Sequence, residues 1–419
     1  MILELEKHKI SVVGLGYVGL PLAIELGKKY ETVGFDINPD RVNQLSLGFD
    51  STNELSENEI KSSKKISFSN KIEDISTSTI YIVSVPTPID VDNKPDLSPL
   101  LSATTMISKF IDKGNIVIFE STVYPGCTEE ECVPIIEKGS NLKYNIDFFC
   151  GYSPERINPG DKKNTITNIK KVTSGSNVET SDLVDKLYSS IIKAGTHKAS
   201  SIRVAEAAKA IENAQRDINI AFINELSMIC DKLKISVYDV LEAAESKWNF
   251  LSFKPGLVGG HCIGVDPYYL AHKAMEVGHN PKIILSGREI NDSMAEFIAD
   301  KFDRAMTSKG KVLLLGITFK ENCSDIRNSG VFKLHESLTN LGYDVTVLDP
   351  HANKEQVRKF YKLDIVNRAS QIITKNFEGL ILAVSHEEFK NHAWEDFILP
   401  QSVILDLKNF LDIENKITL

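Results

Sequence analysis

The feature that most constrains the fold is the stretch 9-KISVVGLGYVGLPLAIELGKKYETVGFDINP-39. A short β-rich run enters the glycine turn 14-GLGYVG-19, a helical pattern follows, and a second apolar run ends at Asp36. This order of strand, glycine turn, helix and strand with a terminal acid is typical of a Rossmann dinucleotide-binding unit. We therefore expect an α/β fold with a doubly wound parallel sheet.

The same unit predicts its cofactor. Gly14 permits the tight turn, Gly16 lets the backbone approach a pyrophosphate, and Gly19 permits close packing of helix on strand. The N-terminus of the helix then offers free N–H groups to the phosphates. Asp36 would accept a hydrogen bond from a ribose hydroxyl and repel a 2′-phosphate, which favours NAD over NADP. The alternative is a tight turn that binds no ligand.

Two further apolar runs, 79-TIYIVSVPTP-88 and 115-NIVIFESTVYPG-126, end in Ser, Thr and Pro. In a doubly wound sheet the carboxyl ends of the strands face the cofactor. Thr87, Ser121 and Thr122 are therefore expected cofactor neighbours. Ordinary loop capping by hydroxyl side chains explains each of them equally well when taken singly.

A helical pattern without Pro or Gly covers residues 199–235, with Ser200 or Ser201 available as the N-cap. Such a helix runs ~50 Å, so we expect a spine between domains and a dimer surface. Lys209 and Asn213 share a face away from the apolar stripe, and a mid-helix Asn needs a particular reason. The apolar stripe consists of Val204, Ala208, Ile211, Ile218, Phe222, Leu226, Ile229 and Leu233.

The segment 310–352 repeats the first unit: KVLLLG echoes KISVVG, and YDVTVLDP echoes ETVGFDINP. Its glycine fingerprint is replaced by 319-FKENCSDIR-327, so a second Rossmann-like unit with a different ligand, such as a mononucleotide, is expected. The runs 379–386 and 402–409 would be further strands. A purely structural α/β lobe is the alternative.

Length and charge limit the remaining possibilities. A chain of 419 residues is expected to form two to three domains. A net charge of −9 argues against general binding to nucleic acid or to a membrane surface. The six cysteines lack CxxC spacing, so neither a metal site nor a disulfide framework is expected, and the chain is expected to be cytoplasmic.

Seven motifs occur in family order, and together they resemble the UDP-glucose/GDP-mannose dehydrogenase family from Lys9 to about residue 410. Members of this family oxidise the C6 alcohol of a nucleotide sugar to a carboxylate. The resemblance implies two Rossmann-like domains joined by a long central helix and a helical dimerisation region. The expected division is 1–198 for NAD, 199–300 for the helical region and 301–419 for the UDP-sugar. The motifs are 14-GLGYVG-19, 85-VPTP-88, 120-ESTVYPG-126, 153-SPERINPGD-161, 205-AEAAKAIEN-213, 255-PGLVGGHCIGVD-266 and 319-FKENCSDIR-327.

The chemistry of this family explains a cysteine between glycines. Oxidising CH2OH to a carboxylate removes four electrons, and each NAD accepts two. A thiolate at Cys262 can add to the intermediate aldehyde, and loss of a second hydride then gives a thioester that water hydrolyses. Outside such a motif, a lone cysteine is usually a small buried hydrophobe.

The resemblance also assigns roles to other residues. Lys209 and Asn213 align with a pair that stabilises negative charge on the C6 oxygen. Asp266 aligns with an aspartate that orients a water or accepts a proton. Glu155 aligns with a carboxylate implicated in thioester hydrolysis, where it could be the general base.

The expected binding residues follow from the same motifs. Lys254 is a weaker candidate than the others, as is Arg288, because a surface ion pair is the ordinary role of such residues. Expected cofactor-binding residues are Gly14, Gly16, Tyr17, Val18, Gly19, Asp36, Arg41, Thr87, Thr122 and Arg327. Expected substrate-binding residues are Glu155, Arg156, Lys209, Asn213, Lys254, Gly259, His261 and Lys320.

Two departures from the UDP-glucose branch point to the substrate. After Glu155 the sequence continues RINPGD, and around the thiol it reads GGHCIGVD. Both resemble the branch that acts on UDP-N-acetylhexosamines, with Arg156, Asn158 and His261 as candidate contacts for the N-acetyl group. UDP-N-acetylglucosamine is the expected substrate. The alternative substrates are UDP-glucose, UDP-N-acetylgalactosamine and UDP-N-acetylmannosamine. The alternative functions are those of a two-electron dehydrogenase and of a non-catalytic NAD-binding sensor. A homodimer is expected.

Overall fold

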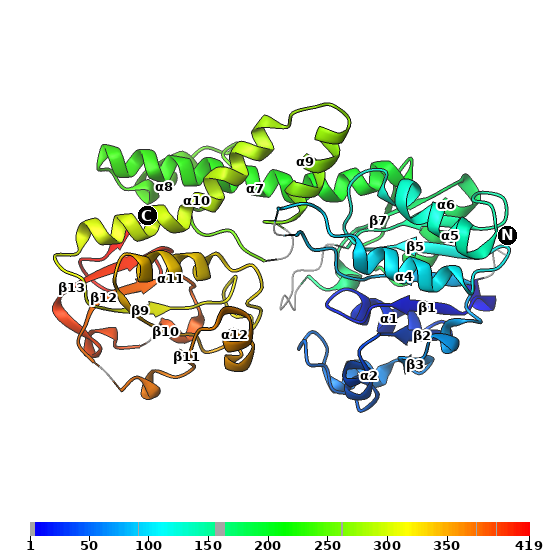
Figure 1. The fold of residues 1–419 in the computed structure, drawn as a ribbon, viewed down its shortest axis with the longest axis horizontal. Coiled ribbons are helices and arrows are strands. Elements are labelled where there is room, and N and C mark those ends of the chain that lie inside the picture. The colour runs from blue at the N-terminus through cyan, green and yellow to red at the C-terminus, as the bar shows by residue number, and fades with distance from the viewer. Residues whose placement is uncertain (1–4, 91, 156–163, 261–262, 374, 391) are drawn as a thin grey trace. The chain divides into compact units, whose positions relative to one another are not determined.

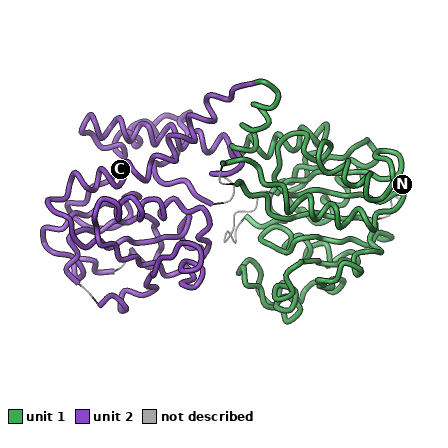
Figure 2. The backbone as a smooth tube through the Cα atoms, in the orientation of Figure 1, with its two compact units in different colours: residues 1–212, 268–278 green, residues 213–267, 279–419 purple. Residues whose placement is uncertain are grey.

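The computed structural model describes residues 5–90, 92–155, 164–260, 263–373, 375–390 and 392–419. The chain divides into two compact units, coloured separately in Figure 2. Unit 1 comprises residues 1–212 and 268–278, and unit 2 comprises residues 213–267 and 279–419. Each unit contains one mainly parallel sheet (Figure 1).

The sheet of unit 1 has the order β3-β2-β1-β4-β5-β6-β7-β8. The first six strands in sequence are parallel in the order 3-2-1-4-5-6, which is the Rossmann order. Strand β7 pairs antiparallel to β6 and extends the sheet. The strands are β1 (Ile10–Val13), β2 (Thr32–Phe35), β3 (Ile66–Ser69), β4 (Ile80–Val83), β5 (Ile116–Phe119), β6 (Phe149–Tyr152), β7 (Lys171–Gly175) and β8 (Thr196–Lys198).

Central strands of unit 1 are buried along their whole length, as expected where helices cover both faces of a parallel sheet. Alternate residues of β1, β4 and β5 share one apolar core with helices α1 and α6. The helices of this unit are α1 (Gly19–Gly27), α2 (Pro39–Ser46), α3 (Glu57–Ser62), α4 (Ser98–Ser108), α5 (Val133–Ser140) and α6 (Val178–Ser189).

Unit 2 contains a second sheet with the order β11-β10-β9-β12-β13-β14. All its pairings are parallel, and the sequence order is again 3-2-1-4-5-6. Val312 and Leu314 of β9 pack in one core while Leu313 and Leu315 pack in another, so both faces of this sheet are covered. The strands are β9 (Lys311–Leu315), β10 (Asp344–Leu348), β11 (Ile365–Val366), β12 (Phe377–Leu382), β13 (Ile398–Asp406) and β14 (Ile417–Thr418). The predicted pair of Rossmann-like sheets is confirmed.

The remaining helices are α7 (Ile202–Leu233), α8 (Val237–Glu245), α9 (Asp266–Glu276), α10 (Lys282–Ala305), α11 (Gly330–Asn340) and α12 (Lys354–Tyr361). The predicted long helix is α7, with 32 residues, and the side chain of Ser201 accepts a hydrogen bond from the Val204 N–H at its start. Its burial pattern is the reverse of that of an ordinary surface helix, whose apolar face is buried. Polar residues such as Lys209 and Asn213 are buried, whereas Ile211 and Phe222 of the apolar stripe are more than half exposed. In the part of the chain that the structure describes, none of the helices is both long and apolar enough to cross a lipid bilayer.

Candidate active site

The glycine turn between β1 and α1 has the tight backbone at Gly14 and the close packing at Gly19 that its sequence predicts. Gly14 has φ +94°, and a Cβ there would lie 2.4 Å from the carbonyl oxygen of Ser84. A Cβ on Gly19 would lie 1.9 Å from the carbonyl oxygen of Gly14. Gly16 is exposed, and a Cβ there would meet nothing within 4 Å. The open backbone at Gly16, before the N-terminus of α1, therefore fits a dinucleotide pyrophosphate.

Asp36 and Arg41 both form hydrogen bonds with the backbone of Leu15, the second residue of this turn. The Asp36 carboxylate accepts a hydrogen bond from the Leu15 N–H at 2.9 Å, and the Arg41 guanidinium donates to the Leu15 carbonyl at 3.0 Å. Arg41 is buried and also pairs with Asp50 at 2.7 Å. Burial alone would raise the pKa of Asp50, but hydrogen bonds from Thr52, Leu55 and Arg41 lower it overall. Arg41 thus braces the glycine turn from inside the protein.

The segments that follow β4 and β5 are connected by two hydrogen bonds of Ser121. The Ser121 hydroxyl accepts from the Val85 N–H at 3.1 Å and donates to the Val85 carbonyl at 2.7 Å. Thr87 and Thr122 follow these adjacent parallel strands and are half-buried, as are Tyr17 and Val18 in the glycine turn. Ser121 therefore fixes one loop to the other, and the two threonines lie beyond the carboxyl ends of β4 and β5.

Lys209 and Glu155 meet in unit 1 although 54 residues separate them. The Lys209 ammonium on α7 donates to the backbone carbonyl of Glu155 at 2.7 Å, and both residues are buried. The Glu155 carboxylate is 2.8 Å from the ammonium of Lys171. Lys171 was not among the predicted site residues. It follows Lys170 directly, and two adjacent lysines in a sequence usually indicate exposed side chains.

Glu206 is a second residue that the sequence analysis did not single out. Its carboxylate accepts from the N–H groups of Gly126 at 2.6 Å and Thr128 at 2.9 Å, which ties the ESTVYPG motif to α7. Burial raises the pKa of Glu206 to about 7, although hydrogen bonds from Thr128 and Gly126 oppose this shift. In the motif 205-AEAAKAIEN-213 nothing local marks this acid as buried, because acidic side chains on helices are mostly exposed.

Asn213 and Asp266 meet in unit 2. The Asn213 amide donates to the Asp266 carboxylate at 2.5 Å, and both residues are almost completely buried. The carbonyl oxygen of the Asn213 amide is buried without a hydrogen-bond partner among the described residues. Asp266 is the first residue of α9, four positions after Cys262. This pair therefore positions the end of the cysteine motif and leaves one polar atom available for a ligand or water.

The segment leading to the cysteine is anchored at Gly256. The amide of Asn224 on α7 donates to the Gly256 carbonyl at 3.0 Å and accepts from the Gly256 N–H at 2.8 Å. Asn224 also donates to the Asn291 side chain on α10 at 2.8 Å. Asn224 was missed, although a mid-helix Asn is the same signal that identified Asn213.

The glycines of the cysteine motif pack on the FKENCSDIR segment. A Cβ on Gly259 would lie 2.8 Å from the Asn328 carbonyl oxygen, and the Gly260 N–H donates to the same oxygen at 3.3 Å. Arg327 is half exposed and pairs with Asp325 at 2.8 Å, and the Lys320 ammonium lies over the Phe319 ring. Unit 2 thus brings two predicted motifs together.

Basic residues gather beside this segment. The ammonium of Lys408, after β13, would lie 2.6 Å from a Cβ on Gly256, and Lys408 is half-buried. Burial lowers the pKa of Lys408, and the charge of the exposed Lys254 lowers it further, against the effects of Glu321 and Asp406. Lys408 was missed because the strand end that carries it has no motif. Two neighbouring cations on one surface of unit 2 can together hold an anion.

Arg288 does not form the surface ion pair that was expected. Its side chain is buried and pairs with Asp217 at 2.6 Å and with Asp292 at 2.8 Å. The pair links α10 to α7 within unit 2. Arg156, Asn158, His261 and Cys262, which were also predicted as site residues, lie outside the described residues.

Asp349 is the acid of the second Rossmann-like unit that corresponds to Asp36 in the first. Asp349, at the end of β10, is fully buried and accepts from the Ile317 N–H at 2.6 Å, just as Asp36 accepts from Leu15. Burial alone would raise the pKa of Asp349, but hydrogen bonding to His386 and its charge, with the N–H groups of Ile317 and Ala352, lower it to about 2. The Asp349 carboxylate also lies 3.1 Å from His386 Nε2 and accepts from four backbone N–H groups, so its oxygens are already engaged by the protein.

Comparison with protein families matches nearly all of the chain. The NAD binding domain of the UDP-glucose/GDP-mannose dehydrogenase family matches residues 8–192. The central domain of this family matches residues 203–293, and its UDP binding domain matches residues 313–413.

Individual relatives match over the full length. The UDP-N-acetyl-D-glucosamine 6-dehydrogenase of Pseudomonas aeruginosa is 52% identical over 96% of this chain and 97% of its own. The enzyme of the same name from Salmonella typhi is 49% identical over 98% of each chain. The solved UDP-D-ManNAc dehydrogenase from Pyrococcus horikoshii has a TM-score of 0.87 with 28% identity over 98% of each chain. The chain therefore belongs to the UDP-glucose/GDP-mannose dehydrogenase family, and it is an NAD-dependent oxidoreductase.

Proposed function

We propose that the chain oxidises the C6 alcohol of UDP-N-acetylglucosamine to the uronate in an NAD-dependent, four-electron reaction. The observation that carries this proposal is the full-length similarity, at 52% and 49% identity, to two enzymes named for that substrate. Several relatives named for the manno sugar are 28% to 32% identical. The product would be a precursor of surface polysaccharide, made in the cytoplasm.

Three parts of the chain would share the work. Residues 1–198 would bind NAD, residues 199–300 would carry the cysteine motif and the dimer surface, and residues 301–419 would bind the UDP group. NAD would be held by the turn at Gly16 and by Asp36, Thr87 and Thr122, and it would accept hydride in both oxidations. Lys254, Gly259 and Lys320 would hold the nucleotide sugar, and Arg327 would contact the cofactor.

The first oxidation would depend on control of charge at the C6 oxygen. As the alcohol loses its proton and its hydride, negative charge develops on this oxygen before the aldehyde forms. Lys209 and Asn213 lie one turn apart on α7, and both can donate hydrogen bonds to such an oxygen. The hydrogen bond between Asn213 and Asp266 supports a role for Asp266 in orienting a water or accepting the proton.

The second oxidation would proceed through Cys262. Its thiolate adds to the aldehyde carbon and forms a C–S bond, giving a thiohemiacetal. Transfer of the second hydride to a second NAD, with loss of the hydroxyl proton, would leave a thioester. Water then attacks the thioester carbon while Glu155 takes the proton of the water, the C–S bond breaks, and the thiolate is restored with release of the carboxylate. Arg156 and His261 would contact the N-acetyl group.

Counting NADH tests this proposal directly. A limiting, known amount of UDP-N-acetylglucosamine with excess NAD should yield two NADH per sugar at completion, because alcohol and aldehyde are both oxidised. One NADH per sugar would mean that the reaction stops at the carbonyl and that the covalent route is wrong. If NADH appeared only with UDP-N-acetylgalactosamine, UDP-N-acetylmannosamine or UDP-glucose, the sugar assignment would be wrong and the chemistry would stand. Binding of NAD without turnover of any of these sugars would indicate a sensor.

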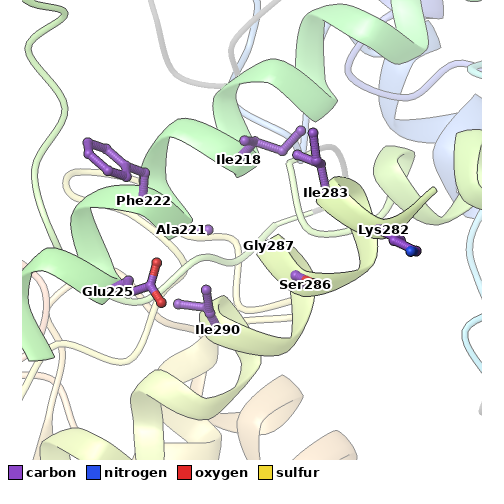
Figure 3. A pocket seen from close by; sticks show the side chains of 9 residues that line it. All are labelled: Ile218, Ala221, Phe222, Glu225, Lys282, Ile283, Ser286, Gly287 and Ile290. Carbon is purple, nitrogen blue, oxygen red and sulfur yellow. The ribbon is translucent and has the colours of Figure 1, made fainter.

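We also propose that the chain forms a homodimer through α7. Phe222, Ile229 and Leu233 on α7 are about half exposed or more, and Ile283 on α10 is 72% exposed. A pocket of about 290 Å³ lies between the two helices. The residues that line it, labelled in Figure 3, are Ile218, Ala221, Phe222, Glu225, Lys282, Ile283, Ser286, Gly287 and Ile290. An apolar surface of this kind usually marks a protein–protein contact.

A charge on this surface should dissociate the dimer. Phe222→Glu combined with Ile229→Glu would place two carboxylates in an apolar contact and raise the dimer dissociation constant at least ~100-fold, as expected for changes at central contact residues. Light scattering at micromolar concentration would measure this as a halved molar mass. Ile373→Glu is the matched control, because Ile373 is 97% exposed on the loop before β12 and lies outside this surface. A wild-type chain that is monomeric at this concentration would contradict the proposal.

A further inference from the structure

Unit 1 contains a buried ion cluster that the proposed mechanism does not use directly. Lys171, the first residue of β7, is 2% exposed. Its ammonium lies 2.6 Å from the Glu120 carboxylate and 2.8 Å from the Glu155 carboxylate. The hydroxyl of Tyr188 on α6 donates to the second oxygen of Glu120. One cation therefore stands between two carboxylates that belong to different motifs.

The ammonium also fixes the backbone next to Glu155. It donates to the carbonyl oxygens of Pro154 at 3.1 Å and Ser153 at 3.3 Å. Three of its four acceptors thus belong to the segment 153–155. Burial disfavours the charged ammonium, but Glu120 and Glu155 outweigh this effect and raise the pKa of Lys171, so it stays protonated. A buried charge with this many partners holds them in a single arrangement.

Glu155 is consequently held at two points. Lys171 holds its carboxylate, and Lys209 donates to its backbone carbonyl at 2.7 Å. Glu120, the other partner of Lys171, begins the segment that carries Thr122. The ammonium of Lys171 therefore connects the loop expected at the cofactor with the loop that carries the proposed base.

We propose that Lys171 is a positioning residue for the second half of the reaction, which fixes the Glu155 carboxylate for hydrolysis of the Cys262 thioester. This inference rests on the proposed function. Lys171 is not expected to touch substrate or cofactor. Without Lys171, the Glu155 carboxylate can turn away from the water that it must deprotonate. The two oxidations should continue, because Lys209, Asn213 and Cys262 are unchanged.

Lys171→Met tests the inference, because it removes the charge and keeps most of the side-chain volume. Rapid mixing with NAD and UDP-N-acetylglucosamine should give a burst of two NADH per active site, followed by turnover at least ~100-fold slower than wild type, the usual size of a lost general-base contribution. The thioester should then accumulate on Cys262, where intact-protein mass spectrometry would detect the added sugar nucleotide. Glu155→Gln should show the same burst and adduct, and the double variant should be no slower, because both changes remove one function.

Three further variants separate positioning from stability. Tyr188→Phe removes a hydrogen bond from the opposite side of Glu120, so it should lower the melting temperature without a burst or an adduct. The single variant Lys171→Met leaves the buried carboxylates of Glu120 and Glu155 without their cation, and it could fail to fold for that reason. In that case the double variant Glu120→Gln with Lys171→Met removes one of these two charges and should show the same adduct. Lys171→Arg keeps the charge and should restore part of the turnover.

The possible outcomes are distinguishable. A folded variant lacking the Lys171 charge that turns over in a single phase without adduct overturns the inference and leaves the proposed function standing. A wild-type enzyme that yields fewer than two NADH per sugar overturns the proposed function and this inference with it.

Discussion

Replacing Cys262 by serine is expected to abolish uronate formation, with kcat for the carboxylate product lowered at least ~10⁴-fold. Loss of a catalytic nucleophile costs this much or more in enzymes with covalent intermediates. A serine hydroxyl is a weaker nucleophile than a thiolate and would need an activating base. NADH production and the carboxylate product, counted separately, would show which oxidation is lost. Two NADH per sugar from the serine variant would contradict the covalent mechanism.

The other cysteines make this variant easy to interpret. Cys127, Cys132, Cys150, Cys230 and Cys323 are all buried free thiols. Burial raises the pKa of Cys150 and Cys323, which keeps them protonated and unreactive. Cys323→Ser is the matched control, because the Cys323 thiol donates to the Lys320 carbonyl and a serine hydroxyl can make the same bond. This control should retain two NADH per sugar.

Much of the fold could be predicted because its signals are local. The runs before Gly14 and Gly316 became β1 and β9, and the acids Asp36 and Asp349 end the next strand in each sheet. Such signals depend on residues close together in sequence, where strand and turn preferences act directly. Short strands such as β11, with only two residues, have too little pattern to be predicted.

The burial of polar side chains could not be predicted in the same way. The apolar stripe of α7 would ordinarily face the core, yet Phe222 is 59% exposed while Asn213 is fully buried. Lys171 and Lys170 are adjacent and identical, but only Lys171 meets two carboxylates. These outcomes depend on partners 16 to 53 residues away, such as Glu155 for Lys171 and Asp266 for Asn213. Motif order predicts which residues form the site, and only the fold shows which of the described residues are paired.

The glycine turn gives the second large effect, because two of its glycines differ in what a methyl group would meet. At Gly14 a Cβ would overlap the Ser84 carbonyl and the backbone has φ +94°, so Gly14→Ala should destabilise unit 1 by at least ~2 kcal/mol. At Gly16 the space around a Cβ is open, and φ is not in the left-handed region. Gly16→Ala should therefore leave the folded state intact.

The affinity for NAD should be lowered by Gly16→Ala, the variant that leaves the folded state intact. A methyl group on Gly16 would occupy the space through which the backbone approaches the pyrophosphate. The loss of two hydrogen bonds to a charged phosphate costs about 3 kcal/mol or more, so the Kd for NAD should rise at least ~100-fold. NADH formation at subsaturating NAD should fall by a similar factor.

Calorimetric titration of NAD and thermal unfolding of the same samples would measure both effects. Gly287→Ala serves as the matched glycine-to-alanine control, since a Cβ there makes only ordinary contacts, the nearest at 3.5 Å from Ala221. This control should keep the wild-type Kd for NAD. If Gly16→Ala bound NAD as tightly as wild type, the pyrophosphate would not lie over this turn, because a ligand in hydrogen-bond contact with the backbone leaves no room for a methyl group.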